Sequence, residues 1–389
     1  MRILHVIASM DPKMGGVCSA VQMIIGGLNE FEIYSEVLCL DPPDSSYLRK
    51  DLYPIHAVGV GKTQWRYNPN LFKWLQENAD VFDIFIVHGL WLYTSYAVRK
   101  VIAGMRKNNK KKPKVFIMPH GMLDPYFQRA PGRRIKAIRN WIFWKLIEQK
   151  VIHDADGLLF TCEMEKVLAR TSFRPYRPNK ELVVGLGVEA PPHFCTNMEE
   201  VFFSQSAFQN NQPYLLFIGR IHEKKGVDIL INAYLNIKKK YSNLPCLVIA
   251  GPGKETEYGR SIQKIASKSS DIYFVGMLTG AAKWGAFYGC EAFILPSHQE
   301  NFGIAVVEAM ACGKPVLITK QINIWKEIAD SAAGIVTEDT LSKIEQMLQD
   351  WLNLPLDEKL AMSRNSTRCF QKYFSMRAAS ECLKNVIVQ

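Results

Sequence analysis

Residues 295–315, LPSHQENFGIAVVEAMACGKP, are the stretch from which the fold can be worked out. The apolar run 293–295 has the composition of a strand, and Pro296 ends it because proline cannot donate a ladder hydrogen bond. Asn301 is expected to cap a helix and Gly313 to end it. The stretch therefore predicts a buried strand, a loop and one short helix.

The predicted loop and helix contain two glutamates for which the residues alone allow two interpretations. Ile304, Val307 and Ala311 recur at helical spacing and predict one apolar face. Glu300 lies in the loop before the helix, and Glu308 lies inside it among apolar residues. A carboxylate there is costly unless it is hydrogen-bonded, whereas the N–H groups that open a helix favour an anion. The glutamates are either solvated helix-face residues or parts of a site for a polar, negatively charged ligand.

The composition is that of an ordinary globular protein. The 389 residues are enough for two domains, with 48% hydrophobic and 22% charged residues. No apolar run reaches the roughly 18 residues of a membrane-spanning helix. We interpret the initial MRILHVIASM as a strand rather than a signal peptide. The 9 cysteines are widely spaced without a C-x-x-C, which argues against disulfide and zinc frameworks and favours a reducing cytosol.

The net charge is +11, and most of the excess lies in residues 1–190. Two segments, 99–114 and 129–150, are strongly basic, and the second also contains several tryptophans and isoleucines. A basic helix with aromatic residues suits an anionic membrane surface. The alternative is a solvated basic face whose aromatic residues lie in the core. Nucleic acid is not expected as a partner, because no base-stacking or groove-reading motif accompanies the charge.

Short apolar runs alternate with helical patterns along the chain. The expected strands are 2–8, 36–40, 83–87, 114–118, 156–161, 181–184, 214–218, 247–250, 272–275, 292–295, 316–318 and 334–336. This alternation predicts an α/β protein with two Rossmann-like, doubly wound domains. Ligands bind at the carboxyl ends of the strands in such sheets, so two sheets facing each other would leave a cleft.

A polar, irregular stretch separates the two strand series. It predicts a first domain over 1–190, a linker over 191–212 and a second domain over 213–375. Residues 376–389 are expected to form a C-terminal helix that packs back on the first domain.

Three further groups follow predicted strands. Gly15-Gly16 opens a helix and is either a plain turn or a peptide cradle for a phosphate. Arg220 and Lys225 precede another helix and form either a solvated basic loop or a diphosphate site. His88 and His120 each precede a glycine and are either structural or directed at the expected cleft. No group of histidine, cysteine and aspartate has metal-ligand spacing.

Taken together, the motifs resemble the retaining glycosyltransferases of family 4, which have the GT-B fold. The resemblance covers nearly the whole chain, and its centre is the E-x7-E spacing from Glu300 to Glu308. The accompanying motifs, in the family's order, are HGLW (88–91), PHGMLDP (119–125), TCEMEK (161–166), FIGRIHEKKG (217–226), AGPG (250–253), FVGMLTG (274–280) and INIWKEI (322–328).

The resemblance implies roles for residues of the second domain. Arg220 and Lys225 would bind the donor diphosphate and stabilise the negative charge of the leaving group. Glu300 would hold the donor sugar, and Glu308 would accept hydrogen bonds from the ribose hydroxyls. The N–H groups that would help to hold sugar and phosphate are those of Asn301, Phe302 and Gly303. Neither a metal nor another cofactor is expected.

The resemblance is less complete in the first domain. Gly16 would approach the donor phosphate, and His120 would line the sugar or acceptor side of the cleft. The family's Asn-Gly-Val-Asp is LGVE at 186–189 here, and its Thr-Ser-Glu is TCE at 161–163. These departures concern the acceptor side and leave the diphosphate and E-x7-E positions intact.

The sequence thus predicts a cytoplasmic enzyme, peripheral on the inner face of the membrane. It would move a sugar, with retention of configuration, from a nucleotide-diphosphate sugar to a hydroxyl of a glycan or lipid-linked acceptor. Exopolysaccharide or lipopolysaccharide assembly is the expected setting. The alternatives are a nucleotide-sugar 2-epimerase of the same fold and a non-catalytic nucleotide-sugar-binding protein.

Overall fold

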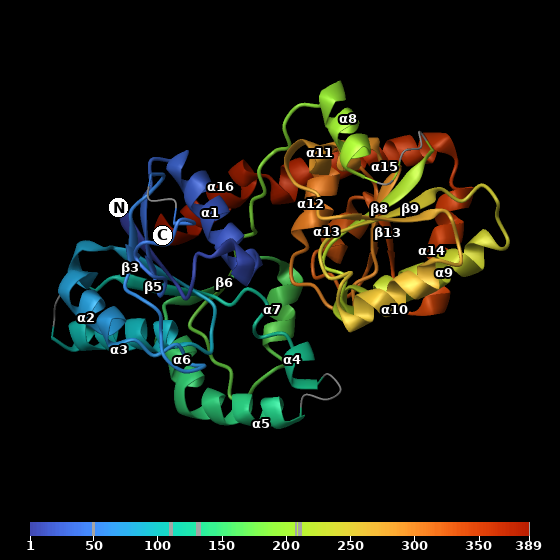
Figure 1. Cartoon of the computed structure of the whole chain (residues 1–389). Coiled ribbons are helices and arrows are strands. Elements are labelled where there is room, and N and C mark those ends of the chain that lie inside the picture. The colour runs from blue at the N-terminus through green and yellow to red at the C-terminus, as the bar shows by residue number, and fades with distance from the viewer. Residues whose placement is uncertain (49–50, 109–111, 130–133, 207, 209–211, 389) are drawn as a thin grey trace. The chain divides into compact units, whose positions relative to one another are not determined.

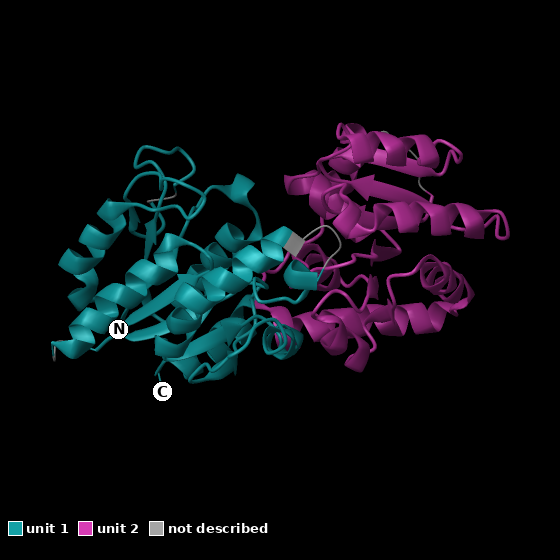
Figure 2. Ribbon diagram, turned by 90° about the horizontal axis from the view of Figure 1, so that it is seen from below, with its two compact units in different colours: residues 1–187, 376–389 teal, residues 188–375 magenta. Residues whose placement is uncertain are grey.

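The chain divides into two compact units. The computed structural model describes residues 1–48, 51–108, 112–129, 134–206, 208 and 212–388. The first unit comprises Met1–Gly187 and Met376–Gln389, and the second comprises Val188–Ser375 (Figure 2). Each unit contains one sheet, and every strand pair in both sheets is parallel.

The first unit has a seven-stranded sheet in the order β3-β2-β1-β4-β5-β6-β7. Its strands are β1 (Arg2–Ile7), β2 (Tyr34–Cys39), β3 (Ile55–Ala57), β4 (Ile84–His88), β5 (Lys114–Met118), β6 (Gly157–Phe160) and β7 (Glu181–Val183). Its helices are η1 (Pro12–Met14), α1 (Gly16–Asn29), α2 (Pro69–Asn78), η2 (Ala79–Val81), α3 (Tyr93–Lys107), α4 (Tyr126–Arg129), α5 (Arg134–Phe143), the π-helical η3 (Trp144–Glu148), α6 (Gln149–Asp154), α7 (Glu163–Ala169) and α16 (Met376–Val388).

The second unit has a six-stranded sheet in the order β10-β9-β8-β11-β12-β13. Its strands are β8 (Tyr214–Ile218), β9 (Cys246–Ala250), β10 (Ile272–Gly276), β11 (Ala292–Leu295), β12 (Val316–Thr319) and β13 (Gly334–Thr337). Its helices are α8 (Thr196–Gln205), η4 (Glu223–Lys225), α9 (Val227–Lys238), α10 (Glu257–Ala266), α11 (Gly280–Gly289), α12 (Ile304–Ala311), α13 (Trp325–Asp330), α14 (Leu341–Asn353), α15 (Leu356–Cys369) and the π-helical η5 (Phe370–Phe374).

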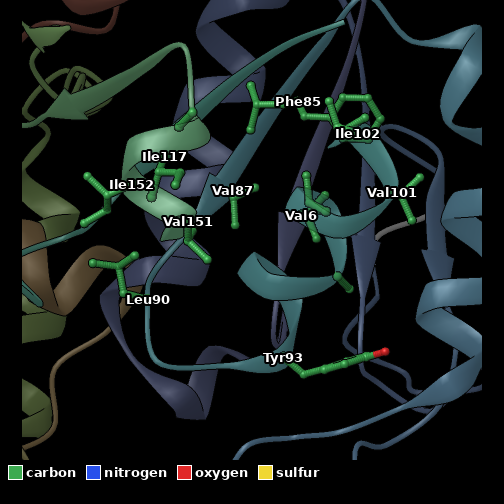
Figure 3. Close-up of a cluster of buried hydrophobic side chains, with 14 of the residues drawn as sticks. Val6, Phe85, Val87, Leu90, Tyr93, Val101, Ile102, Ile117, Val151 and Ile152 are labelled. Carbon is green, nitrogen blue, oxygen red and sulfur yellow. The ribbon is translucent and has the colours of Figure 1, made fainter. Parts of the chain in front are cut away.

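The sequences of the central strands are unbroken apolar runs, because helices cover both faces of each sheet and both sets of side chains are buried. In the first unit, side chains from β1, β4 and β5 pack against α3 and α6 in one cluster, part of which Figure 3 shows. Val6, Phe85 and Ile117 are almost fully buried within it. The prediction of two doubly wound, Rossmann-like domains is therefore confirmed. Both strand orders reverse direction beside the first strand of the sheet, between β1 and β4 and between β8 and β11.

The structure differs from the expected linker over 191–212. Residues 196–205 form α8, which packs on α11, and Phe202 is fully buried there. Polar residues on the exposed side of α8 conceal this short apolar face in the sequence. Residues 207 and 209–211 of the expected linker lie outside the described residues.

The C-terminal helix α16 belongs to the first unit and packs on α1, as Figure 1 shows. Gly27 of α1 makes the close approach possible, because a Cβ there would lie 1.8 Å from Oγ of Ser380. The chain therefore returns to its first helix after completing the second sheet.

Candidate functional site

The loop that follows β11 is held from two sides. Oγ of Ser297 donates a hydrogen bond to the carbonyl oxygen of Lys224 (2.9 Å), and Oγ1 of Thr319 donates one to the carbonyl oxygen of Ser297 (2.6 Å). Gly226, with φ of 66°, brings the η4–α9 junction so close that a Cβ would lie 2.0 Å from the carbonyl oxygen of Pro296. The carboxyl ends of β8 and β11 are thereby joined at the point where the strand order reverses.

Glu300 is fixed at the end of this loop. Its N–H donates to the carbonyl oxygen of Gln321 (2.9 Å), and its carbonyl oxygen accepts from the N–H of Asn323 (3.0 Å). Its side chain forms an ion pair with Lys225, and both side chains are mostly buried. The structure thus brings together two residues, 75 positions apart, that the sequence assigns to one site.

Helix α12 begins at Ile304, and Gly303 is its N-cap with φ of 78°. The prediction that Asn301 caps the helix is therefore wrong. Its Oδ1 instead accepts a weak hydrogen bond from Nδ2 of Asn323 (3.3 Å). The N–H groups of Phe302 and Gly303 donate to no residue that the structure describes. They leave donors at a helix N-terminus, where the helix dipole favours an anion.

Glu308 pairs with a lysine that the sequence analysis did not identify. Its Oε1 accepts a hydrogen bond from Nζ of Lys283 on α11 (2.9 Å). The expected apolar face of α12 is only partly correct. Val307 is buried, but Ile304 and Ala311 are only partly buried. The other buried residues of the helix are Val306, Ala309 and Met310. Since α12 is buried on more than one side, Glu308 needs a partner. Only the position of α11 in the fold shows that Lys283 supplies it.

Arg220 follows β8 on the same edge of the sheet and is exposed. Its side chain has no partner among the residues that the structure describes. The AGPG turn packs against its backbone, because a Cβ on Gly251 would lie 1.9 Å from the carbonyl oxygen of Gly219. Arg220 is thus a cation with no internal ion pair on a tightly packed turn, available to an anionic ligand.

Gly16 and His120 lie in the first unit, each after a strand. Gly16 is the first residue of α1, and a Cβ there would meet no atom within 4 Å. His120 has φ of 51° and lies beyond the carboxyl end of β5. The N–H of Gly121, the next residue, donates to Oε1 of the buried Glu165 (2.6 Å). This contact fixes the turn that carries His120.

His120 is the outer member of a chain of three histidines. Nδ1 of His88 lies 2.9 Å from Nε2 of His120, and Nε2 of His88 lies 2.9 Å from Nδ1 of His5. Burial lowers the pKa of His5 to about 3 and the pKa of His120 to about 4. Burial and the two flanking histidines hold the pKa of His88 well below its ordinary value. All three imidazoles are therefore neutral near pH 7. The sequence predicts His88 and His120 as candidate site residues, whereas no motif in it points to His5.

The basic segment 129–150 exposes part of its apolar set. Trp144 is fully buried, but Trp141 is 54% exposed and Ile138 62% exposed. The alternative that all its aromatic residues lie in the core is therefore wrong. Residues 130–133 of this segment, and 109–111 of the segment 99–114, lie outside the described residues.

The described residues lack two features that would bear on function. They contain no group of three or more histidine, cysteine, aspartate or glutamate residues placed to hold a metal ion. Among the same residues, no helix has both the length and the apolar character needed to cross a membrane.

The known proteins to which this chain is similar are glycosyltransferases. The model of the family described as "Glycosyl transferases group 1" matches residues 198–368. The uncharacterised glycosyltransferase MJ1178 of Methanocaldococcus jannaschii is 30% identical over 341 residues, 84% of this chain and 81% of the relative. The lipopolysaccharide glucosyltransferase WaaG of Escherichia coli K12 is 26% identical over 167 residues, 43% of this chain.

Several of these matches are partial. The chain spans 42% of the length of WaaG and 40% of that of the uncharacterised M. jannaschii glycosyltransferase MJ1607, to which it is 28% identical over 159 residues, 39% of this chain. A structural likeness extends over the whole chain. Anabaena Alr3699/HepE, solved in complex with UDP and glucose, has a TM-score of 0.73 at 14% identity and is covered over 100% of both chains. With its two parallel-sheet, Rossmann-like domains of GT-B type, the chain belongs to the group 1 glycosyltransferases.

Proposed function

We propose that the protein is a retaining glycosyltransferase that moves a sugar from a nucleotide-diphosphate donor to an acceptor hydroxyl. The bond between the anomeric carbon and the diphosphate oxygen breaks, the acceptor oxygen bonds to that carbon, and the proton of the acceptor hydroxyl passes to the released nucleoside diphosphate or to water. The observation that carries the proposal is the Lys225–Glu300 ion pair at the point where the strand order of the second sheet reverses. Ligands of doubly wound sheets bind at this point.

The contacts of the second unit support a division of labour. Arg220 and Lys225 neutralise the diphosphate. The N–H groups of Phe302 and Gly303, which donate to none of the described residues, add donors for sugar and phosphate. Glu300 holds the hydroxyls of the donor sugar. Its ion pair keeps Lys225 ordered before the donor arrives, which reduces the entropy lost on binding. In this proposal Arg220 and Lys225, rather than a metal ion, stabilise the negative charge of the leaving diphosphate. EDTA is therefore expected to leave the rate unchanged.

At the other end of the donor, Glu308 binds the ribose hydroxyls. In the free protein, Lys283 donates to one of its oxygens, which leaves the other able to accept from a hydroxyl. In the first unit, Gly16 approaches the phosphate and His120 contacts the sugar or the acceptor. The donor class is supported by the complex of Anabaena HepE with UDP and glucose.

A panel of UDP-, GDP- and ADP-sugars, incubated with a glycan acceptor and analysed for products, tests the proposal. Sugar transfer with retained configuration supports it. Epimerised nucleotide sugar would favour the 2-epimerase, and binding without turnover would favour a non-catalytic protein.

Lys225→Ala is expected to lower kcat by roughly 10²–10³-fold, as for the loss of one preorganised donor to a developing anion. The matched control is Lys239→Ala, which removes an exposed lysine at the end of α9. Near-normal turnover of Lys225→Ala would contradict the diphosphate assignment.

The acceptor we propose is a lipid-linked glycan at an anionic membrane face, in exopolysaccharide or lipopolysaccharide assembly. The support lies in α5, whose exposed apolar residues Ile135, Ile138 and Trp141 share the helix with Lys136 and Arg139. Such a helix binds an anionic interface by burying its apolar face and attracting lipid charge. The name of the relative WaaG also places that protein in lipopolysaccharide synthesis.

Flotation with vesicles tests the membrane part. The wild-type protein is expected to float with phosphatidylglycerol vesicles at low salt and to remain behind with phosphatidylcholine. Ile138→Ser with Trp141→Ser should abolish flotation while leaving turnover of a soluble acceptor intact. Exposed Leu360→Ser on α15 is the control. Equal flotation of wild type and double variant would exclude α5 as the contact.

A further inference from the structure

The three histidines of the first unit form an ordered line across the strand-order reversal of its sheet. His5 lies on β1, His88 ends β4, and His120 follows β5. Consecutive rings are stacked, with centroids 5.2 Å apart and interplanar angles of 20° and 26°. Each neighbouring pair shares one nitrogen–nitrogen contact of 2.9 Å. A neutral imidazole has one N–H and one bare nitrogen, so the line can run in only two directions.

The two directions differ at the inner end of the line. Nε2 of His5 is buried and has no partner among the described residues. If the hydrogen bonds ran inward, this nitrogen would carry an N–H with no acceptor. If they run outward, it is a bare acceptor. Buried N–H groups without a partner are rarer in proteins than under-used acceptors. The outward direction is therefore favoured, with the proton of each histidine on Nδ1.

At the outer end, Nδ1 of His120 has no partner among the described residues. Unlike Nε2 of His5, this nitrogen is not fully buried. Nε2 of the same ring is occupied by His88. In the outward arrangement, Nε2 of His120 accepts and Nδ1 carries the proton. His120 then offers a neutral N–H donor to whatever lies beside it.

We propose that His5 and His88 are positioning residues that fix the tautomer of His120, so that its Nδ1–H donates to a hydroxyl oxygen of the sugar substrate. The proposal rests on the proposed function for the identity of the substrate. The tautomer itself is a property of the free protein. The fixed turn supports it, because Glu165 accepts from the N–H of Gly121 and holds His120 in one orientation. Depressed pKa values keep the three rings neutral at neutral pH.

Two substitutions at residue 5 separate tautomer control from packing. His5→Asp offers only acceptor oxygens near the former Nδ1, so Nε2–H of His88 should donate to it and Nε2–H of His120 should donate to Nδ1 of His88, which reverses the direction. His5→Asn places an amide N–H₂ near the former Nδ1 and should restore the outward direction. His153→Phe, an exposed histidine of the same unit, is the control for a lost imidazole.

The experiment is nitrogen NMR of the full-length, ¹⁵N-histidine-labelled protein, which distinguishes the tautomers of each ring by the shifts of its two nitrogens. We expect His120 to be protonated on Nδ1 in the wild type, in His5→Asn and in His153→Phe, and on Nε2 in His5→Asp. A wild-type His120 protonated on Nε2, or a tautomer unchanged in His5→Asp, would overturn the proposal.

Kinetics provide the second readout. Turnover scales with the fraction of protein in the competent state, and the competent tautomer is the minor one in His5→Asp, so kcat/KM of this variant should fall roughly tenfold or more. His5→Asn and His153→Phe should stay near the wild type. If the tautomer shifts while kcat/KM does not, the donor role of His120 is wrong. If no variant or wild type transfers sugar, the proposed function fails, whereas the NMR result still decides whether His5 controls the tautomer.

Discussion

Glu300 and Glu308 are carboxylates whose burial costs free energy unless each has a partner. Each carboxylate is mostly buried and each meets one lysine, Lys225 or Lys283. Both pairs are partly shielded from water, so removing one partner leaves a charge that solvent only partly compensates. The alternative that the two glutamates are solvated helix-face residues is therefore wrong for both.

Lys283→Met should destabilise the protein by about 1–3 kcal/mol, because Glu308 keeps its charge without its partner. Urea denaturation measures the change. Lys343→Met on the exposed side of α14 is the control and should have little effect. Adding Glu308→Gln to Lys283→Met should recover part of the loss. Additive losses in the double variant would show that the pair contributes nothing.

Glu148 is a carboxyl group that is fully buried. Its Oε1 accepts from the N–H of Trp91 (3.0 Å), while Oε2 has no partner among the described residues. Burial raises the pKa of Glu148 to about 8, against the opposing effect of the hydrogen bonds from Trp91 and Ser95. The folded protein therefore holds a proton on Glu148 at pH values where the unfolded chain has lost it.

This difference fixes the sign of a pH effect. Between about pH 4.5 and 8 the folded state binds the extra proton, so Glu148 makes stability fall as pH rises, by about 1.4 kcal/mol per pH unit. Glu148→Gln cannot ionise and should become progressively more stable than the wild type across this window. Chemical denaturation at several pH values measures the difference. A constant difference from pH 5 to 8 would contradict the raised pKa.

At the scale of elements, the contact between α1 and α16 depends on two adjacent glycines with different surroundings. A Cβ at Gly27 would lie 1.8 Å from Oγ and 3.0 Å from Cβ of the buried Ser380. A Cβ at Gly26 would meet nothing within 4 Å. One position therefore controls the approach of α16, and the other only weakens α1.

Gly26→Ala should stabilise the protein by about 0.5–1 kcal/mol, because alanine loses less backbone entropy in a helix. Gly27→Ala should instead destabilise it by about 1–3 kcal/mol through overpacking against α16. Thermal unfolding of the two variants gives the comparison directly. Equal stabilisation by both substitutions would mean that α16 does not pack on α1 in solution.

At the scale of the whole molecule, each unit has its own sheet and its own buried core. The second unit is continuous in sequence, and the N–H of Val188 at its start donates to the carbonyl oxygen of Phe374 near its end (2.8 Å). The first unit is completed only by the returning α16. The second unit should therefore fold as a separate fragment more readily than the first.

Residues 188–375 expressed alone should unfold in one cooperative transition and bind the nucleoside diphosphate of the donor. The reason is that every proposed contact to the nucleoside diphosphate except that of Gly16 lies within this unit. Calorimetry of unfolding and titration with UDP, GDP and ADP test this, with Lys225→Ala in the same fragment as the control for specific binding. A fragment without a cooperative transition would show that the second unit depends on the first.

The sequence by itself determined the α/β class, because apolar runs alternate with helical patterns in two series. The resemblance of the motifs to a known family, rather than any spacing within the chain, assigned Lys225 and Glu300 to one site. The sequence missed β3, which has only three residues, and α8, whose apolar face is short. Local patterns of that length carry too little periodicity to be distinguished from loops.

Only the tertiary structure decided which side chains meet. Lys283 reaches Glu308 because α11 lies beside α12, and His5 meets His88 because β1 and β4 are neighbours in the sheet. Both pairs join residues far apart in sequence, so no spacing rule predicts them. The N-cap of α12 was settled in the same way, because the contacts of the Glu300 backbone and the left-handed Gly303 place the first turn. Local sequence specifies which elements can form, whereas packing between them specifies the partners of each charge.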